Sequence, residues 1–294
     1  MPVIELLQQN TAVYYGFAIL LGLIVGSFLN VVIHRLPIML KAGWKAECEA
    51  FLAEEKGTTA PDSETPVFNL NTPGSRCPHC GHAITALENI PVLSYLFLRG
   101  RCRECKTTIS PRYPAIETFT ALLTLACAWR FGVTLQAPFA ILLSWALIAL
   151  AFIDLDEQYL PDSITLPFLW LGLLLNTRAL FTDLESAVTG AAAGYLILWS
   201  VYMLFKKLTG KEGMGFGDFK LLAMLGAWLG WQMLPAIILL SSLVGAAIGI
   251  ALIAMNRHRR GVPIPFGPFL AAAGWITLLW GSDINQAYLR WIMH

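Results

Sequence analysis

Two acidic residues stand at the ends of long apolar stretches, and both could take part in acid–base chemistry. Asp154 lies in FIDLDEQYLPD (152–162), and Asp218 lies in GMGFGDFK (213–220). Ionisable groups at membrane depth are costly and usually have a function. Two carboxyl groups held close together share a proton, so one can act as general base on a water molecule and the other as general acid. The two positions therefore predict a hydrolytic carboxylate pair.

The turn before Asp218 is rich in glycine. Gly213, Gly215 and Gly217 are expected to let the backbone take conformations closed to other residues and to let a substrate chain approach. A competing interpretation is that Asp218 only caps or charges the start of a helix. The sequence leaves both interpretations open for Asp218 alone.

The other acids near the apolar stretches differ in how easily a structural role explains them. Asp154 is expected at the C-terminal end of a helix, where negative charge is unfavourable, and Asp156 and Glu157 beside it add repulsion. Asp162 is better interpreted as a helix-start residue. Glu117 in RYPAIETF follows Pro114 by three residues and fits the first turn of a span.

Four cysteines form two closely spaced pairs, CPHC and CREC, with 21 residues between them. This C-x2-C…C-x2-C pattern is typical of zinc sites, and four thiolates fit a tetrahedral ion with no open position for a catalytic water. A dithiol redox switch is the alternative. The pattern therefore predicts structural zinc, with His79 and His82 as turn residues and with these ligands: Cys77, Cys80, Cys102 and Cys105.

Composition points to a membrane protein, because 56% of the 294 residues are hydrophobic and only 13% are charged, against about 25% in an average soluble domain. We predict an all-α polytopic fold with about eight transmembrane helices, each close to the length that a bilayer requires. A seven-span count stays possible, because only WLGWQMLP separates the sixth and seventh. The expected spans are 13–33, 114–130, 136–153, 163–181, 186–205, 218–231, 232–254 and 265–281.

The distribution of basic residues predicts the orientation. With the N-terminus outside, 17 of the 20 Lys and Arg fall in inner segments, and only Arg130, Arg178 and Arg290 fall outside. Both termini are then extracytoplasmic. The predicted domains are a first transmembrane helix (1–36), a small zinc-ribbon-like cytoplasmic domain (37–112) and a membrane domain of about seven helices (113–294).

Nearly the whole chain resembles the type IV prepilin peptidases, which are GxGD membrane aspartic peptidases with a second, N-methyltransferase activity. The resemblance rests on GSFLNVVIHRLP, the paired CPHC and CREC, SPRYPAIE, IDLDEQYLPD and GMGFGDFKLLAMLGAW. It implies that Asp154 and Asp218 are the catalytic pair.

The resemblance also implies the substrates, the cofactor and the cellular location. The substrates would be type IV prepilins and type II secretion pseudopilins, cut after a Gly on the cytoplasmic side of the bacterial inner membrane and then N-methylated with S-adenosylmethionine. No nucleic acid is expected as a partner. The residues that bind the methyl donor are unknown from the sequence, because Asn30, Arg35, Arg99 and Arg101 are equally explained as interfacial or turn residues.

Two other classes of protein remain as alternatives. A multi-span transporter could use Asp154, Glu117 and Asp218 as a proton or cation relay, but transporters often show internal repeats and midplane charges, and neither is seen here. A secretion-system scaffold with a zinc docking domain would make all the acids structural. The paired motifs favour the peptidase.

Overall fold

The computed structural model describes residues 2–57, 68–255 and 264–292, and these ranges are dominated by α-helices. Within them, the extended pairings are two isolated bridges, Arg76 with Ala83 and Arg101 with Thr108. The chain divides into two compact units, residues 1–126 and 127–294, which are described separately below.

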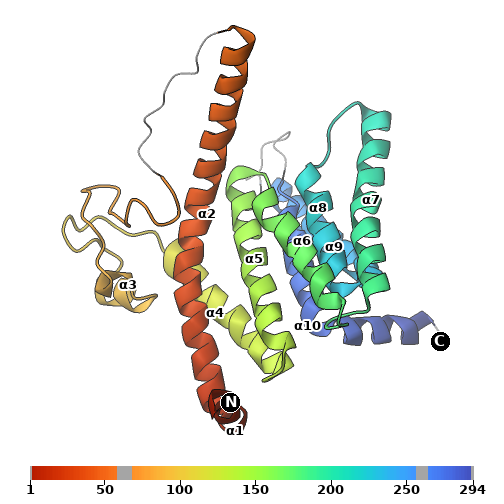
Figure 1. Ribbon diagram of the computed structural model, residues 1–294, viewed down its shortest axis with the longest axis horizontal. Helices are drawn as coiled ribbons and strands as arrows, with labels where there is room; N and C mark the ends of the chain where they lie inside the picture. The colour runs from red at the N-terminus through yellow and green to blue at the C-terminus, as the bar shows by residue number, and fades with distance from the viewer. Residues whose placement is uncertain (1, 58–67, 256–263, 293–294) are drawn as a thin grey trace. The chain divides into compact units, whose positions relative to one another are not determined.

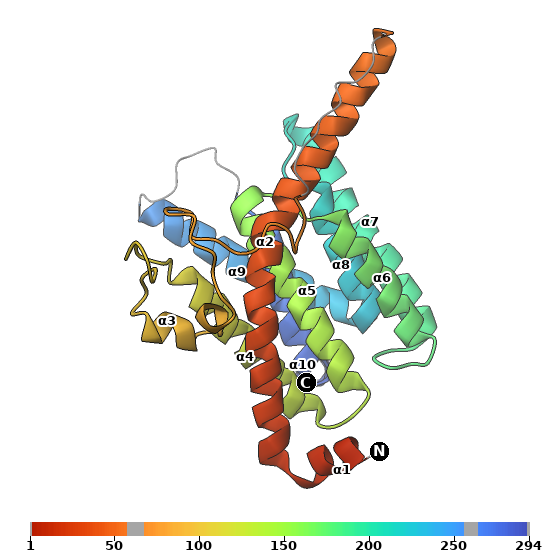
Figure 2. The same cartoon turned by 60° about the vertical axis from the view of Figure 1, so that its left-hand side comes forward.

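The first unit begins with two helices, α1 (Pro2–Gln9) and the much longer α2 (Thr11–Glu55). Figures 1 and 2 show α1 set at an angle to the start of α2. The Asn10 side chain caps α2 by accepting a hydrogen bond from the Val13 N–H at 3.2 Å. With 45 residues, α2 is about 68 Å long, against about 30 Å for the hydrocarbon core of a bilayer. The helix of the first expected span therefore continues well beyond the apolar stretch.

The remainder of the first unit is short elements and loops, followed by the start of α4 (Arg112–Phe131). The short elements are η1 (Leu87–Asn89) and α3 (Leu93–Phe97). Helices α2 and α4 approach closely through glycine, because a Cβ at Gly26 would lie 2.7 Å from the Glu117 Cα. This contact places the first helix directly on the one that follows the loops.

The second unit contains the end of α4 and six further α-helices with one 3-10 turn. Figure 1 shows them as the green to blue part of the ribbon. Their bounds are α5 (Gln136–Glu157), α6 (Asp162–Asn176), α7 (Leu184–Thr209), α8 (Phe216–Leu229), η2 (Trp231–Met233), α9 (Leu234–Ala254) and α10 (Gly267–Ile292).

Helix α8 forms the core of the second unit, since every residue from Leu221 to Leu229 is buried. Figures 1 and 2 both show α6 and α7 beside it. Close backbone approach allows this packing. A Cβ at Gly194 would meet the Leu222 carbonyl oxygen at 2.7 Å, and a Cβ at Gly226 would collide with the backbone of Gly190.

Polar contacts tie α6 to α8 at both ends and in between. Those of Trp228 and Asn176 satisfy donors that would be costly to leave unpaired in an apolar interior, whereas the Lys220–Asp162 pair lies nearer the surface. The contacts are Lys220 Nζ with Asp162 Oδ2 at 2.7 Å, Trp228 Nε1 to the Phe168 carbonyl at 2.7 Å, and Asn176 Nδ2 to the Ala227 carbonyl at 2.9 Å.

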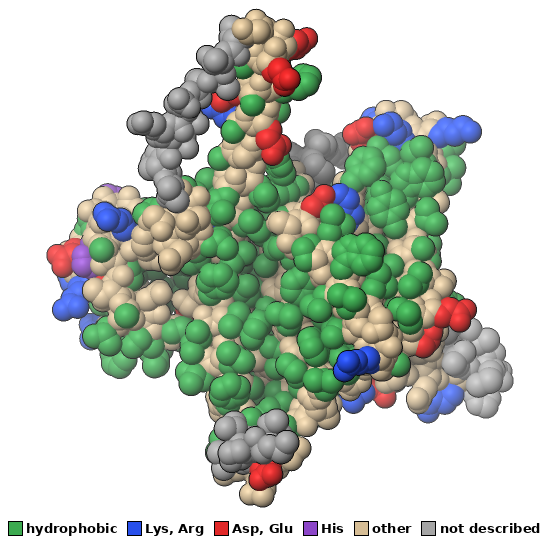
Figure 3. All heavy atoms as spheres, in the orientation of Figure 1, with side chains coloured by type: hydrophobic (Ala, Val, Ile, Leu, Met, Phe, Trp, Pro, Cys, Tyr) green, Lys and Arg blue, Asp and Glu red, His purple; other side chains and the backbone are tan. Residues whose placement is uncertain are grey.

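The outer faces of the helices are apolar, as expected in lipid. Figure 3 shows hydrophobic side chains covering most of the visible face of α5, α6 and α7. Trp170 and Leu174 on α6 are each 64% exposed. Such a large apolar surface is unusual for a soluble monomer.

Within the described ranges, four helices are long and apolar enough to cross a membrane, namely α2, α5, α7 and the segment Trp231–Ala254. The chain is therefore a multi-pass membrane protein. Each of the eight expected spans coincides with one helix, but α6 has only 15 residues and α8 only 14. The count of eight crossings remains a prediction.

The α7–α8 contact predicts the effect of a one-carbon change. In Gly226→Ala the new methyl group meets the Gly190 backbone, so the helices must separate at a cost of about 1–3 kcal/mol. The melting temperature in detergent should fall, whereas Gly16→Ala, which meets nothing within 4 Å, should leave it unchanged. Equal melting temperatures for the two variants would contradict the described packing.

Candidate active site and cysteine cluster

Asp154 lies in the last turn of α5 and is only 5% exposed. Its Oδ2 atom accepts a hydrogen bond from the Gly267 N–H, at the start of α10, at 2.9 Å. Helix α5 ends three residues later, where Gln158 takes a left-handed conformation and its N–H bonds back to the Asp154 carbonyl. The carboxyl group is thus held between two helix ends.

Asp218 lies in the first turn of α8 and is 7% exposed. Its carboxyl group contacts the Gly215 N–H, which is the N-cap position of the helix. The next residue, Phe219, packs against Tyr195 and Tyr202 of α7, which fixes the orientation of this turn. Its place in the first turn is one where negative charge is favourable, which is compatible with the helix-start role expected as an alternative. It does not exclude a chemical role.

The two carboxyl groups lie close enough for the charge of Asp154 to act on Asp218. Leu160 forms the base of this arrangement, because a Cβ at Gly217 would meet its side chain at 2.8 Å and a Cβ at Gly267 would meet it at 3.3 Å. The end of α5 and the starts of α8 and α10 therefore converge on one point. Two buried carboxyl groups in one low-dielectric place can divide the roles of acid and base.

The glycines of the turn act differently from what the sequence suggested. None of Gly213, Gly215 and Gly217 has a positive φ, so the expected need for an unusual backbone conformation is wrong. The Phe205 side chain packs against Gly213, and the Leu160 side chain packs against Gly217. A larger residue would not fit at either position. A Cβ at Gly215 would meet only the Asp218 carboxyl, at 4.0 Å, so the space in front of that group is open.

An apolar hollow of about 410 Å³ lies beside this turn, between α7, α9 and α10. Met214 of the turn lines it, together with Phe266, which precedes Gly267 in the chain. The hollow is thus adjacent in sequence to the turn that carries Asp218 and to Gly267, the donor to Asp154.

Sequence reasoning missed Gly267, the donor to Asp154. Its only signal was a glycine between Phe266 and Pro268 at the start of an apolar segment. For two other acids, the expectation is confirmed for Asp162 and wrong for Glu117. Asp162 begins α6 and pairs with Lys220. Glu117 is the sixth residue of α4 rather than a first-turn residue, because the helix begins before Pro114.

The four predicted cysteines come together in the first unit. Their sulfur atoms all lie within 4.8 Å of one another, with Cys77 and Cys105 at 3.8 Å and Cys80 and Cys102 at 4.0 Å. Four sulfurs around zinc, at about 2.3 Å from the ion, lie about 3.8 Å apart, so the cluster is compatible with zinc.

The two cysteine loops have the same local structure. Gly81 N–H bonds to the Cys77 carbonyl and Lys106 N–H to the Cys102 carbonyl, at 2.9 and 3.1 Å. Both Gly81 and Lys106 have positive φ, +74° and +60°. Each cysteine pair is thus followed by the same tight turn.

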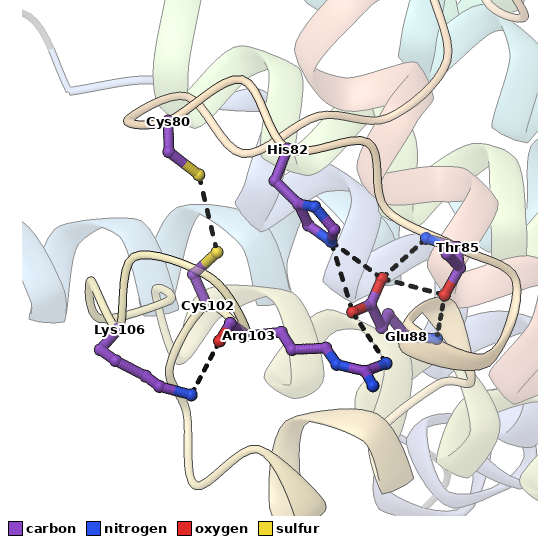
Figure 4. A network of polar contacts seen from close by, with 7 residues as sticks. All are labelled: Cys80, His82, Thr85, Glu88, Cys102, Arg103 and Lys106. Atoms are coloured by element: carbon purple, nitrogen blue, oxygen red, sulfur yellow. Dashed lines mark hydrogen bonds and ion pairs between the residues drawn. The ribbon is translucent and has the colours of Figure 1, made fainter.

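Glu88 joins the two loops, as Figure 4 shows. It accepts hydrogen bonds from the N–H and hydroxyl of Thr85, each at 2.9 Å, and contacts His82 Nε2 at 3.3 Å and Arg103 at 3.6 Å. These contacts, the backbone N–H of Thr85 foremost, lower the pKa of Glu88 to about 2. Since His82 follows the first pair and Arg103 lies within the second, Glu88 braces the cluster. The contact also agrees with the expectation that His82 is not a ligand.

Comparisons with known proteins show the family of the chain. Residues 20–131 match the bacterial peptidase A24 N-terminal domain, and residues 141–250 match the type IV leader peptidase family. A Stutzerimonas stutzeri protein is 55% identical over 99% of both chains. The chain belongs to the type IV leader peptidase family.

Other curated relatives carry the same name, prepilin leader peptidase/N-methyltransferase. One from Aeromonas hydrophila is 56% identical over 97% of both chains, and one from Pseudomonas aeruginosa is 54% identical over 99% of this chain and 98% of its own. No solved structure matches. Because the family is a protease family, the converging carboxyl groups of Asp154 and Asp218 in the second unit are candidates for peptide-bond cleavage.

The contact of Gly267 with Asp154 predicts a loss of peptidase activity in Gly267→Ala. The added Cβ would lie 2.6 Å from the Asp154 Oδ2, so the carboxyl group must turn away from its position. We expect the cleavage rate to fall at least about 100-fold, as misplacement by about 1 Å does in other enzymes. Gly249→Ala, whose Cβ makes only an ordinary contact at 3.5 Å, should retain full activity. Full activity in both variants would show that the position of Asp154 is not needed.

The brace by Glu88 predicts weaker metal retention in Glu88→Gln. The amide cannot hold His82 and Arg103 as the carboxylate does, so the two loops should separate more readily. If zinc occupies the cluster, its affinity measured against a competing chelator should fall about tenfold. Glu104→Gln, an exposed change beside Cys105, should leave it unaltered. Equal affinities would remove the role assigned to Glu88.

Proposed function

We propose that this protein removes the leader peptides of type IV prepilins and type II secretion pseudopilins, and then methylates the new N-terminal amine. The observation that carries the proposal is the pair of buried carboxyl groups, Asp154 and Asp218, that converge in a chain so similar to named prepilin peptidases. Cleavage would follow a glycine of the substrate, on the cytoplasmic face of the bacterial inner membrane. The distribution of Lys and Arg supports that orientation.

In the proposed mechanism, a water molecule lies between the two carboxyl groups. The ionised carboxylate takes a proton from the water, whose oxygen attacks the scissile carbonyl carbon, while the protonated carboxyl group gives its proton as the C–N bond breaks. The products are the leader carboxylate and a new N-terminal amine. The Gly267 N–H holds one oxygen of Asp154, which leaves the other free to face the water.

The apolar hollow beside Met214 and Phe266 would take the hydrophobic segment that follows the cleaved bond. Its volume of about 410 Å³ is within the range for ligand pockets, and it opens beside the turn that carries Asp218. A hydrophobic substrate helix could reach it from the bilayer. This arrangement would place the scissile peptide bond of the substrate at the membrane interface.

We further propose that the four cysteines bind a structural zinc ion and that S-adenosylmethionine supplies the methyl group. Four cysteines leave no open position on the metal, so the ion would stabilise a region with little apolar core. The domain boundaries at 36 and 112, the eight crossings and the roles of Gly215 and Gly217 beside the pair are parts of the same proposal.

The carboxylate pair predicts that Asp154→Asn and Asp218→Asn each abolish cleavage, because an amide can neither take the water's proton nor return it. Mass spectrometry of a prepilin incubated with the purified protein should show at least a 1,000-fold loss of rate, while methylation of an already cleaved peptide persists. The matched control is Asp156→Asn, an exposed change two residues along α5, which should cut normally. Retained cleavage in either active-site variant would refute the assignment.

A further inference from the structure

A cavity of about 530 Å³ lies inside the first unit, away from the carboxylate pair in the sequence. One wall is α2, from Ile24 to Arg35, and the other walls are the loops 70–75 and 86–91. The volume falls within the range of about 300–1,000 Å³ that small-molecule sites occupy. Neither the peptidase chemistry nor the cysteine cluster uses it.

The Arg35 guanidinium lies at the wall of this cavity in a fixed position. One of its NH1 hydrogens is donated to the Asn69 carbonyl at 3.0 Å, and the group lies 5.6 Å from the ring centre of Phe68. The Asn69 side chain in turn accepts from the N–H groups of Asn71 and Thr72, at 2.8 and 2.7 Å, which stiffens the loop. A guanidinium has five N–H donors, so the held group keeps donors for an anionic ligand such as a carboxylate.

The rest of the lining suits a ligand with an amino-acid end and a flat heterocyclic end. Asn71 and Asn89 offer amide donors and acceptors that match the edge of a purine. Ile24 and Leu70 supply apolar surface, and the Phe28 ring could face a cationic centre. No carboxylate is among the described lining residues, so the polar end of a ligand is best matched at Arg35.

A buried carboxylate joins the α2 wall of this cavity to the loop wall. Glu117 is 8% exposed, and its Oε2 accepts the Val92 N–H at 2.7 Å, directly after the lining residue Pro91. Its carboxyl group also contacts the side chain of Ser27, another lining residue. The cavity is therefore held open by packed and hydrogen-bonded walls.

We propose that this cavity binds the methyl donor, S-adenosylmethionine, with the ligand's carboxylate on Arg35 and its adenine among Asn71 and Asn89. The proposal rests on the methyltransferase part of the proposed function and assigns its site. In the reaction, the lone pair of the neutral substrate amine forms a bond to the methyl carbon. The C–S bond breaks with its electron pair staying on sulfur, and the amine then loses a proton. The products are the N-methyl amine and S-adenosylhomocysteine.

Binding of S-adenosylhomocysteine to the full-length protein in neutral-lipid nanodiscs tests the site directly by calorimetry. Arg35→Gln removes the carboxylate partner and should weaken binding about 10- to 100-fold. Ala86→Trp, at an exposed lining position, should fill the cavity and weaken binding similarly. Arg178→Gln, an exposed change of equal charge in the second unit, should bind as the unaltered protein does.

Leader cleavage and bound zinc serve as readouts of folding, and both should be unchanged in Arg35→Gln and Ala86→Trp. Unaltered affinity in both variants, with methylation intact, would overturn the site and leave the proposed function standing. If the unaltered protein neither binds S-adenosylhomocysteine nor methylates a cleaved peptide, the methyltransferase proposal and the site fail together.

Discussion

The second unit depends on one helix that is buried on all sides along most of its length. Helix α8 has no face left for solvent or lipid between Leu221 and Leu229, so its neighbours must come close on every side. Glycines on α7 and α8 make that approach possible. The helix begins with a carboxyl group that is costly to bury, and its place in the first turn, beside the N-cap residue Gly215, offsets part of that cost.

The first unit is stabilised in a different way, because its loops have few large apolar side chains to bury. Two cysteine loops of the same design face each other, and a single carboxylate, Glu88, connects them through His82 and Arg103. A second buried carboxylate, Glu117, connects the following loop to α4 through the Val92 N–H. Polar contacts therefore do in this unit what side-chain packing does in the other.

The sequence was most informative where function depends on a side chain of a rare type in an unusual place. The carboxyl groups at span ends and the paired cysteines were both predicted, and the structure brings each set together. It was least informative where function depends on the backbone. Every residue except proline has a backbone N–H, so the sequence marks Gly267 only as a glycine before a proline and not as the donor to Asp154. The extension of α2 to Glu55 was also missed, because its charged residues resemble a polar domain as much as a solvated helix.

The polar ties between α6 and α8 bear on how a substrate gains access. Because Asp162, Phe168 and Asn176 are each bonded to α8, these two helices should move as one rigid body. Any gate that opens by separating them would break three polar contacts, of which the one from Asn176 is buried. The apolar hollow lies instead where α7, α9 and α10 face one another, and only side-chain packing has to yield there. Lateral entry by that route would leave the start of α8, and the carboxyl group on it, undisturbed while the gate opens.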